Sequence, residues 1–471
     1  MVDGKVLAAR FAGAADFETR KVISGGNELE IFFLDGLTSG RDIADFIVQP
    51  LHEARQDERE ETLFTRAERG LVWCASMKKA SSTDEAAELL VNGFCVILFP
   101  KTGKALGCEV KTGEKRSPSA PEAENTVKGA KDAFTETLRT NTSLIRRHLR
   151  TPELRLEESV VGRRSLTKIT VCWVEGLTDP ELPARMKKRL GEIDIDGLLS
   201  PAAVEEYVTG SRKTAFPLLE FTERTDHFCQ GLLDGQVGLL VDGLPIGYLA
   251  PVSFGRLMRS PEDRATDYLS ASMLRILRYL ALGVSLLLPG IYAAMAMFHQ
   301  QMLPTKLLLS IIESKQDVPF STLFEVVGLL CAFELLQQAG LHLPQAIGTA
   351  VSIIGGLVVG TAAVDAKLVS PAALIVTASS GICGFTLPNR DLSDALRLWR
   401  LGLTVLGGVF GLFGVTAGLL LLLIKLAGLE SLGRSYLAPF GEAEVKGALV
   451  RKRLAEFLAD KLRRRDIPLK E

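Results

Sequence analysis

Two glutamates interrupt an otherwise apolar stretch of this 471-residue sequence. Glu325 and Glu334 lie nine residues apart within residues 320–340. Charged groups at membrane depth are energetically expensive and usually face the interior of a helix bundle or water. We expect both carboxylates near one face of a helix, where they line a polar pathway or form a subunit contact. The alternative is an interfacial helix that never reaches the bilayer core.

A stripe of small residues follows in the next apolar stretch. Gly348, Ser352, Gly356 and Gly360 recur every four residues. At about 100° per residue, each step shifts the stripe by only about 40°, which gives a smooth ridge along one helix. Because small residues let helix backbones approach closely, the stripe predicts either packing within the chain or a self-associating helix that lines a pore. The same spacing recurs in two separate pairs, Gly407 with Gly411 and Gly414 with Gly418.

Motifs for covalent chemistry are missing from the sequence. It has no Walker A, G-x-G-x-x-G, H-E-x-x-H or G-x-S-x-G pattern. Residues 222–228, TERTDHF, bring acids, a base and a histidine together, but helix caps and ion pairs use the same residue types. The seven cysteines form no C-x-x-C pair, which argues against a metal site. We therefore expect no catalytic activity, no cofactor and no metal.

The elements that position these residues divide the chain into a polar and an apolar part. Residues 1–272 contain no uncharged run longer than 13 residues, whereas residues 273–428 contain runs of 27, 30, 22 and 24. A membrane-spanning helix needs about 20 apolar residues. The sequence predicts a soluble head, a helical membrane domain over residues 273–428 and a basic tail over residues 429–471. The net charge of -1 gives no indication of nucleic-acid binding.

The membrane domain has five apolar stretches, at residues 274–298, 320–340, 344–364, 368–388 and 401–428. Arg275 and Arg278, just before the uncharged run that begins at Tyr279, place the head in the cytoplasm by the positive-inside rule. The basic tail favours the same side. An even number of crossings is then required, so one of the five stretches is re-entrant or interfacial. We expect this to be residues 320–340, which contain the two glutamates.

The head contains an internal repeat. Residues 35–38, DGLT, correspond to residues 175–178, EGLT, at an offset of 140. Asn92-Gly93 and Asp234-Gly235, at an offset of 142, each precede an apolar run and read as a turn that leads into a strand. We expect two tandem α/β subdomains, each with strand, helix, helix, strand and strand, at residues 1–130 and 131–272. The alternative is two ordinary βα units that look alike by chance.

A charged connector, residues 111–130, separates the two copies, and a helix with apolar spacing follows it. Arg146, Arg147 and Arg150 crowd the end of this helix. Cations are favourable there because of the helix dipole. The pattern fits either a basic surface for a partner or lipid headgroups, or a solvated helix end.

Several long blocks resemble the GerA family of spore germination proteins. These include residues 289–308, PGIYAAMAMFHQQMLPTKLL, and residues 332–371, AFELLQQAGLHLPQAIGTAVSIIGGLVVGTAAVDAKLVSP. In the head, FLDGL, TNTSLIRRHLR, VGRRSLTK and VDGLP are similar to blocks of the same family. Thr225 stands where the family usually has proline, and residues 129–134, GAKDAF, depart from its usual GPREGF block. The resemblance covers about nine-tenths of the chain.

The resemblance implies the A subunit of a nutrient germinant receptor in the inner membrane of a bacterial spore. Such receptors combine this subunit with a transporter-like B subunit and a lipoprotein C subunit. It further implies a homo-oligomer that forms a nutrient-gated ion channel, with membrane lipid around it. The few spans of this chain also require several copies to build a pore. The alternatives are a non-conducting membrane-anchored scaffold of the germination complex, or a paralogue from the stage V sporulation branch.

Overall fold

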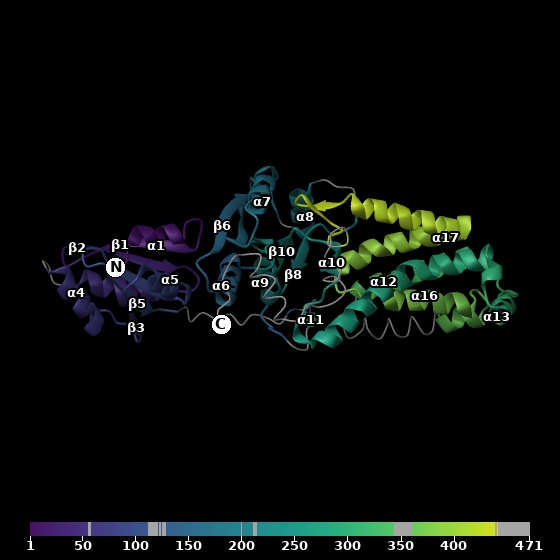
Figure 1. Ribbon diagram of the computed structural model, residues 1–471, viewed down its shortest axis with the longest axis horizontal. Coiled ribbons are helices and arrows are strands. Elements are labelled where there is room, and N and C mark those ends of the chain that lie inside the picture. Colours follow the sequence, from purple (N-terminus) through teal and green to yellow (C-terminus); the bar gives the residue numbers. More distant parts are fainter. Residues whose placement is uncertain are drawn as a thin grey trace. The chain divides into compact units, whose positions relative to one another are not determined.

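The computed structural model describes residues 1–54, 58–111, 121, 124, 129–198, 200–210, 214–342, 360–438 and 440 (Figure 1). Contacts divide the chain into two compact units. The first unit comprises Met1–Arg212, Leu218–Pro251 and Ser431–Gly433. The second unit comprises Lys213–Pro217, Val252–Glu430 and Arg434–Glu471.

The first unit consists of two five-stranded antiparallel sheets with the same strand order. The first sheet has the order β1-β2-β4-β5-β3, formed by β1 (Phe17–Ser24), β2 (Asn27–Leu34), β3 (Met77–Ala80), β4 (Phe94–Phe99) and β5 (Lys104–Glu109). The second has the order β6-β7-β9-β10-β8, formed by β6 (Leu154–Val161), β7 (Thr167–Val174), β8 (Glu220–Thr222), β9 (Val237–Val241) and β10 (Gly247–Ala250). The identical order confirms the two related α/β subdomains.

Each copy contains two strands that the sequence pattern did not reveal. They are the outer strands β1 and β3 of the first sheet, and β6 and β8 of the second. Outer strands bury one side less completely, so their apolar residues are diluted by exposed polar ones. β1, with the sequence FETRKVIS, buries only two of its eight residues, whereas all six residues of the central β4 are buried.

Helices cover both faces of each sheet. In the first copy, α1 (Gly4–Arg10) and α5 (Thr83–Val91) pack on one face, through a core that includes Leu7, Leu90 and Leu98. The opposite face is covered by α2 (Gly40–Ile43), η1 (Ala44–Val48), α3 (Gln49–His52), α4 (Glu60–Arg66) and η2 (Ala67–Leu71). In the second copy, α6 (Leu138–His148) and α9 (Thr225–Leu233) take the place of α1 and α5, and α7 (Glu181–Gly191) and α8 (Pro201–Thr209) cover the other face.

The predicted turns before the central strands are helix ends in both copies. Gly93 follows α5 with φ of 81°, and Gly235 follows α9 with φ of 90°. This left-handed conformation favours glycine, because other residues place a Cβ too close to the backbone. The turn sequence therefore fixes where each helix stops and where β4 or β9 begins.

A buried ion pair joins the two copies. The guanidinium of Arg146 on α6 donates to both carboxylate oxygens of Asp16, at 2.7 and 2.8 Å. The two side chains are only 1% and 3% exposed. Nearby, the amide of Ala15 donates to the carbonyl of Leu156 at 2.8 Å. The sequence analysis placed Arg146 either on a basic surface or at a solvated helix end, but it faces inward because it supplies the charge that neutralises Asp16.

The second unit is a helical bundle (Figure 1). It begins with the short helices α10 (Phe254–Leu257) and α11 (Glu262–Ala265), and its main helices are α12 (Tyr268–Met297), α13 (Thr305–Lys315), α14 (Thr322–His342), α16 (Pro371–Gly384) and α17 (Arg390–Ala427). The turn η3 (Gln300–Met302) precedes α13, and the short strands β11 (Glu430–Ser431) and β12 (Arg434–Ser435) follow α17. Among the described residues, three helices are long and apolar enough to cross a membrane: Tyr268–Met297, Thr322–Ala339 and Arg390–Ala427. The chain is therefore a membrane protein.

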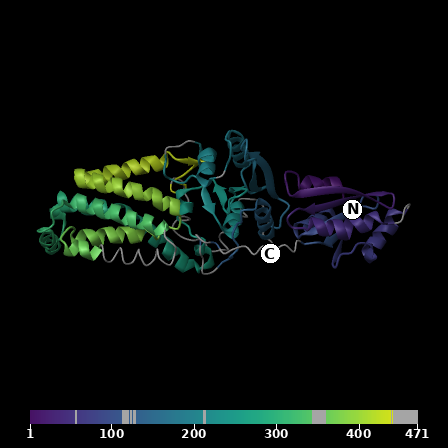
Figure 2. The ribbon, with the colours of Figure 1, turned by 180° about the vertical axis from the view of Figure 1, so that it is seen from behind.

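The last of these helices is folded back on itself at Gly411, which has φ of 66° and ψ of -153°. A Cβ on Gly414 would lie 2.1 Å from the carbonyl oxygen of Leu406, eight residues earlier. In a straight helix these residues would be about 12 Å apart. Residues 390–410 and 412–427 therefore form two antiparallel arms, which lie side by side in both views (Figures 1 and 2). The sequence suggested one continuous stretch over residues 401–428, with the irregular stretch at residues 320–340; the structure instead puts a chain reversal at Gly411.

The hairpin brings the chain back to the end of the bundle at which α12 begins. The amide of Phe254, shortly before α12, donates to the carbonyl of Tyr436 at 2.7 Å. The ring of Phe440 contacts Tyr279 on α12, with centroids 5.9 Å apart. The described chain thus returns at Tyr436 and Phe440 to the end of this unit at which α12 begins.

Candidate functional site

The strongest candidate for a functional centre is the set of charged side chains inside the bundle. Glu325 lies in the first turn of α14, and its side chain has no exposed surface. Its carboxylate is 3.0 Å from the ammonium of Lys315 on α13. It also accepts hydrogen bonds from the amide and hydroxyl of Ser370, at 3.1 and 2.8 Å. Ser370 caps the start of α16, so Glu325 ties three helices together at one end of the bundle.

Glu334 forms a second centre further along α14. It accepts hydrogen bonds from Arg400 at 2.9 Å and from Arg397 at 3.3 Å, both on the first arm of α17. Arg397 also contacts Asp394 at 3.2 Å. Arg400 is nearly buried, with 5% of its side chain exposed. A buried guanidinium requires a carboxylate partner, so Glu334 holds α14 against α17.

The two glutamates belong to different faces of α14. Nine residues at about 100° each amount to two full turns plus about 180°. Their expected position on one face was therefore wrong, and the separate partners of the two carboxylates agree with this geometry. Glu325 neutralises Lys315 of α13, and Glu334 contacts the two arginines of α17. Both carboxylates are therefore paired within the described part of the bundle.

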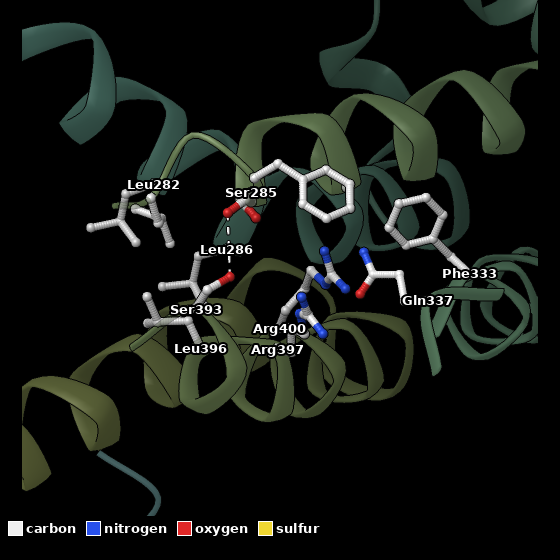
Figure 3. Close-up of a pocket in the computed structure, with 13 residues that line it drawn as sticks. Leu282, Ser285, Leu286, Phe333, Gln337, Ser393, Leu396, Arg397 and Arg400 are labelled. Atoms are coloured by element: carbon white, nitrogen blue, oxygen red, sulfur yellow. Dashed lines mark hydrogen bonds between the residues drawn. The ribbon is translucent and has the colours of Figure 1, made fainter. Parts of the chain in front are cut away.

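A small cavity adjoins the second centre (Figure 3). Ser285, Gln337, Ser393 and Arg400 contribute polar groups to its wall, and Phe333 contributes an aromatic ring. The hydroxyl of Ser393 donates to the carbonyl of Gly384 at 3.3 Å. The cavity volume is 10 Å³, which is enough for about one water molecule. It is too small to pass a hydrated ion.

Close glycine contacts pack helices of the bundle against one another. A Cβ on Gly407 would lie 2.4 Å from the carbonyl oxygen of Gly290 on α12, and a Cβ on Gly418 would lie 2.5 Å from the side chain of Leu403. The small-residue spacing in α17 thus packs its two arms together and packs the first arm against α12. In the other predicted stripe, a Cβ on Gly360 would meet Leu374 at an ordinary 3.6 Å. Gly348, Ser352 and Gly356 lie outside the described residues.

The TERTDHF segment of the head forms a network of caps and ion pairs. Arg224 donates to both carboxylate oxygens of Asp226, at 2.9 and 2.6 Å. His227 lies 2.8 Å from the carboxylate of Glu220. Arg224 forms an ion pair and His227 contacts a carboxylate, which is the expected structural use of such residues.

Two acids from the segment between the copies extend this network. The carboxylate of Asp132 accepts from the hydroxyl of Thr225 at 2.6 Å and lies 2.7 Å from His148. Burial opposes its charge, but these hydrogen bonds hold the pKa of Asp132 below its ordinary value. Glu124 accepts from Thr222 at 2.5 Å, and burial raises the pKa of Glu124 above its ordinary value.

The sequence analysis did not identify the cationic partners of the two glutamates. Lys315 lies ten residues before Glu325, on a short helix between apolar stretches. Arg397 and Arg400 precede the last apolar stretch by one turn. The available signal was the spacing of three residues between the two arginines, which places them on one face of a helix. Only the folded chain shows that this face meets Glu334.

Comparison with known proteins finds relatives that match most of the chain. A family profile described as "Bacillus/Clostridium GerA spore germination protein" matches residues 5–465. Spore germination protein KA of Bacillus subtilis (strain 168) is 34% identical over 90% of this chain and 78% of its own length. An uncharacterized membrane protein of the same organism, YfkQ, is 34% identical over 89% of this chain and 82% of its own length. The crystal structure of the N-terminal domain of the A subunit of the Bacillus megaterium spore germinant receptor GerK3 is 25% identical, with a TM-score of 0.42, over 53% of this chain and 93% of that domain.

Proposed function

The chain belongs to the GerA family of spore germination proteins, and from this we propose that it is the A subunit of a nutrient germinant receptor that assembles into a nutrient-gated ion channel. Its site is the inner membrane of the spore, with the head in the cytoplasm. Its partners are a transporter-like B subunit and a lipoprotein C subunit. It has no catalytic role.

The observation that carries this proposal is the charge buried within the membrane unit. Glu325 and Glu334 and their partners tie α13, α14, α16 and α17 together. Ionisable groups at membrane depth mark ion pathways or gates. In this proposal the ion pairs hold the helices of the closed state, and opening the channel rearranges them. Such pairs suit a gate, because their energy depends on close contact and on the exclusion of water.

The conducting path in this proposal lies between copies of the chain. The cavity beside Arg400 has a volume of only 10 Å³, so it offers no route for a hydrated ion. The apolar side chains that α17 exposes include Phe410, Phe413 and Leu420. These surfaces are available to lipid or to a second copy, and several copies would enclose a central path.

Reconstitution into liposomes tests the proposal. The purified full-length chain should assemble into a homo-oligomer by native mass spectrometry and should carry a cation flux above that of empty liposomes. With the B and C subunits present, the flux should respond to nutrient. An oligomer that binds both subunits but conducts nothing would overturn the channel and establish the non-conducting scaffold. A monomer would overturn a path between copies.

The double variant Glu325→Gln with Glu334→Gln tests the role of the buried charge. Glutamine keeps the shape of each side chain and one hydrogen-bond acceptor but removes the charge. We expect an assembled oligomer with altered gating and lower cation selectivity. Asp394→Asn, at a more exposed partner of Arg397, is the matched control and should leave both properties unchanged. If the double variant gates and selects ions as the wild type does, the two glutamates only hold the helices together and have no role in conduction.

A further inference from the structure

A large groove in the first unit is not explained by the channel. It has a volume of 1120 Å³ and lies where α5, β3 and the end of α6 come together. Its wall includes Lys78 on β3, Phe94 at the start of β4 and Arg147 at the end of α6. The groove thus spans both copies of the repeat, which the Arg146–Asp16 pair joins.

The wall of the groove is predominantly basic. It includes five cations, Lys78, Lys79, Lys111, Arg147 and Arg150, and three acids, Glu85, Glu88 and Glu109. The ammonium groups of Lys78 and Lys111 lie 5.2 and 5.4 Å from the ring centre of Phe94. They hold positive charge above an apolar floor, an arrangement that suits a carboxylate attached to an apolar chain.

The second copy shows what lies against its corresponding strand. β3 and β8 are the equivalent outer strands of the two sheets. The register makes Lys78 of β3 equivalent to Glu220 of β8, and Thr222 lies two residues further along β8. Thr222 donates to the carboxylate of Glu124, so an acidic residue of the chain itself lies against the second copy.

In the second copy, the chain also pairs with the residues just beyond the end of β8. Ala133 pairs with Arg224 immediately after β8, and the amide of Phe134 donates to the carbonyl of Glu223 at 2.8 Å. Within the described strands, β3 is the corresponding edge of the first sheet. Lys78 and Lys79 of β3 are exposed. An edge strand offers backbone groups to an added extended segment.

We infer that this groove binds an acidic peptide segment, which lies extended along β3 and places carboxylates against Lys78, Arg147 and Arg150. In the second copy, an acid of the chain itself, Glu124, contacts the equivalent outer strand β8. The three acids in the wall favour a peptide with separated charges over an anionic membrane surface, because a continuous sheet of phosphates would bring negative charge against them. The inference does not depend on channel activity, since binding is measured directly.

Fluorescence anisotropy tests this inference. The full-length chain, in nanodiscs of phosphatidylcholine, is titrated into a fluorescein-labelled Glu-Val-Glu-Val-Glu-Val peptide, with Gln-Val-Gln-Val-Gln-Val as the neutral control. The acidic peptide should bind, and the neutral peptide should bind much more weakly. Arg147→Glu with Arg150→Glu should weaken the acidic peptide by about tenfold or more, since two charge-assisted contacts become repulsive.

The matched control is Arg163→Glu with Arg164→Glu, an adjacent exposed pair outside the groove. It makes the same change in net charge and should leave affinity within about twofold. Equal weakening by both variants would show diffuse attraction and overturn the site. So would the absence of peptide binding. Phosphatidylglycerol vesicles that bind through Arg147 and Arg150, while the peptide does not, would assign the groove to lipid and also overturn the proposal.

Discussion

The head and the bundle both bury charge, but the surroundings give the buried pairs different tasks. In the head, Arg146 and Asp16 join two subdomains that each have their own apolar core. In the bundle, Glu334 and Arg400 join helices whose outer surfaces are as apolar as lipid. The hydrophobic effect stabilises the subdomains in water, whereas helices in lipid associate through close packing and polar contacts.

This difference shows which contacts fix the arrangement of the parts within each unit. Removing the Arg146–Asp16 pair should leave two folded subdomains with an altered junction. Removing the Glu334 contacts should leave helices that retain the glycine packing of Gly407 against Gly290. In the head, the buried pair and backbone contacts such as that of Ala15 with Leu156 join two folded subdomains, while in the bundle charge and close packing hold the helices themselves together.

The largest expected effect comes from Arg146→Ala. This change leaves the carboxylate of Asp16 buried without its partner, and breaking a buried pair in this way costs about 3–5 kcal/mol. Native-state hydrogen exchange should show that α6 and the start of β1 open more easily. Arg163→Ala, whose side chain is 71% exposed beside Asp194, is the control and should change stability by about 0–1 kcal/mol. Equal losses of stability in the two variants would contradict a special role for the buried Arg146–Asp16 pair.

A smaller loss is expected from Gly407→Ala in the bundle. The added Cβ would meet the carbonyl oxygen of Gly290 at 2.4 Å, and overpacking of this kind costs about 1–3 kcal/mol. The fraction of folded protein after heating in detergent should fall, as measured by gel filtration. Gly402→Ala, with open space around the added Cβ, should behave as wild type. If Gly407→Ala leaves the folded fraction unchanged, close packing does not hold α12 against α17.

Glu334→Gln should have a more modest effect. Polar contacts between membrane helices contribute about 0.6–2 kcal/mol, and the glutamine can still accept a hydrogen bond from Arg400. The same thermal assay should register a shift smaller than that of Gly407→Ala. Pairing the change with Arg400→Met should recover part of the loss, because the buried cation is then also removed. A loss larger than that of Arg146→Ala would reverse the contrast between the two units.

The smallest effect concerns the pH dependence of the head. The pKa of Asp132 is below its ordinary value of about 4 in the folded chain. Its contribution to stability is therefore present above pH of about 4 and is lost as the pH falls further and the carboxyl becomes protonated. Asp132→Asn should reduce the fall in melting temperature that the head shows as the pH drops below about 4. If the fall in melting temperature is unchanged, hydrogen bonding by Thr225 and His148 does not favour the charged form of Asp132.

The sequence predicted the parts of the fold that depend on local pattern. The repeat was visible because DGLT and EGLT, and the glycine turns at Gly93 and Gly235, recur at nearly one offset. The glycine spacing at Gly407 and Gly418 indicated close packing. The outer strands β1 and β3 were missed because an outer strand keeps fewer buried apolar residues.

What the sequence by itself determined is which residues must avoid water, which must bend and which carry charge. It could not determine the partners, because Glu325 meets Ser370 forty-five residues away and Arg146 meets Asp16 at a separation of 130. The reversal at Gly411 was likewise decided by tertiary structure. Its apolar surroundings are compatible with one long helix, and only the packing of Gly414 on Leu406 and of Gly407 on Gly290 favours two arms. Local composition sets the hydrophobic and conformational preferences, whereas charge pairing and close packing depend on atoms that come together only when the chain has folded.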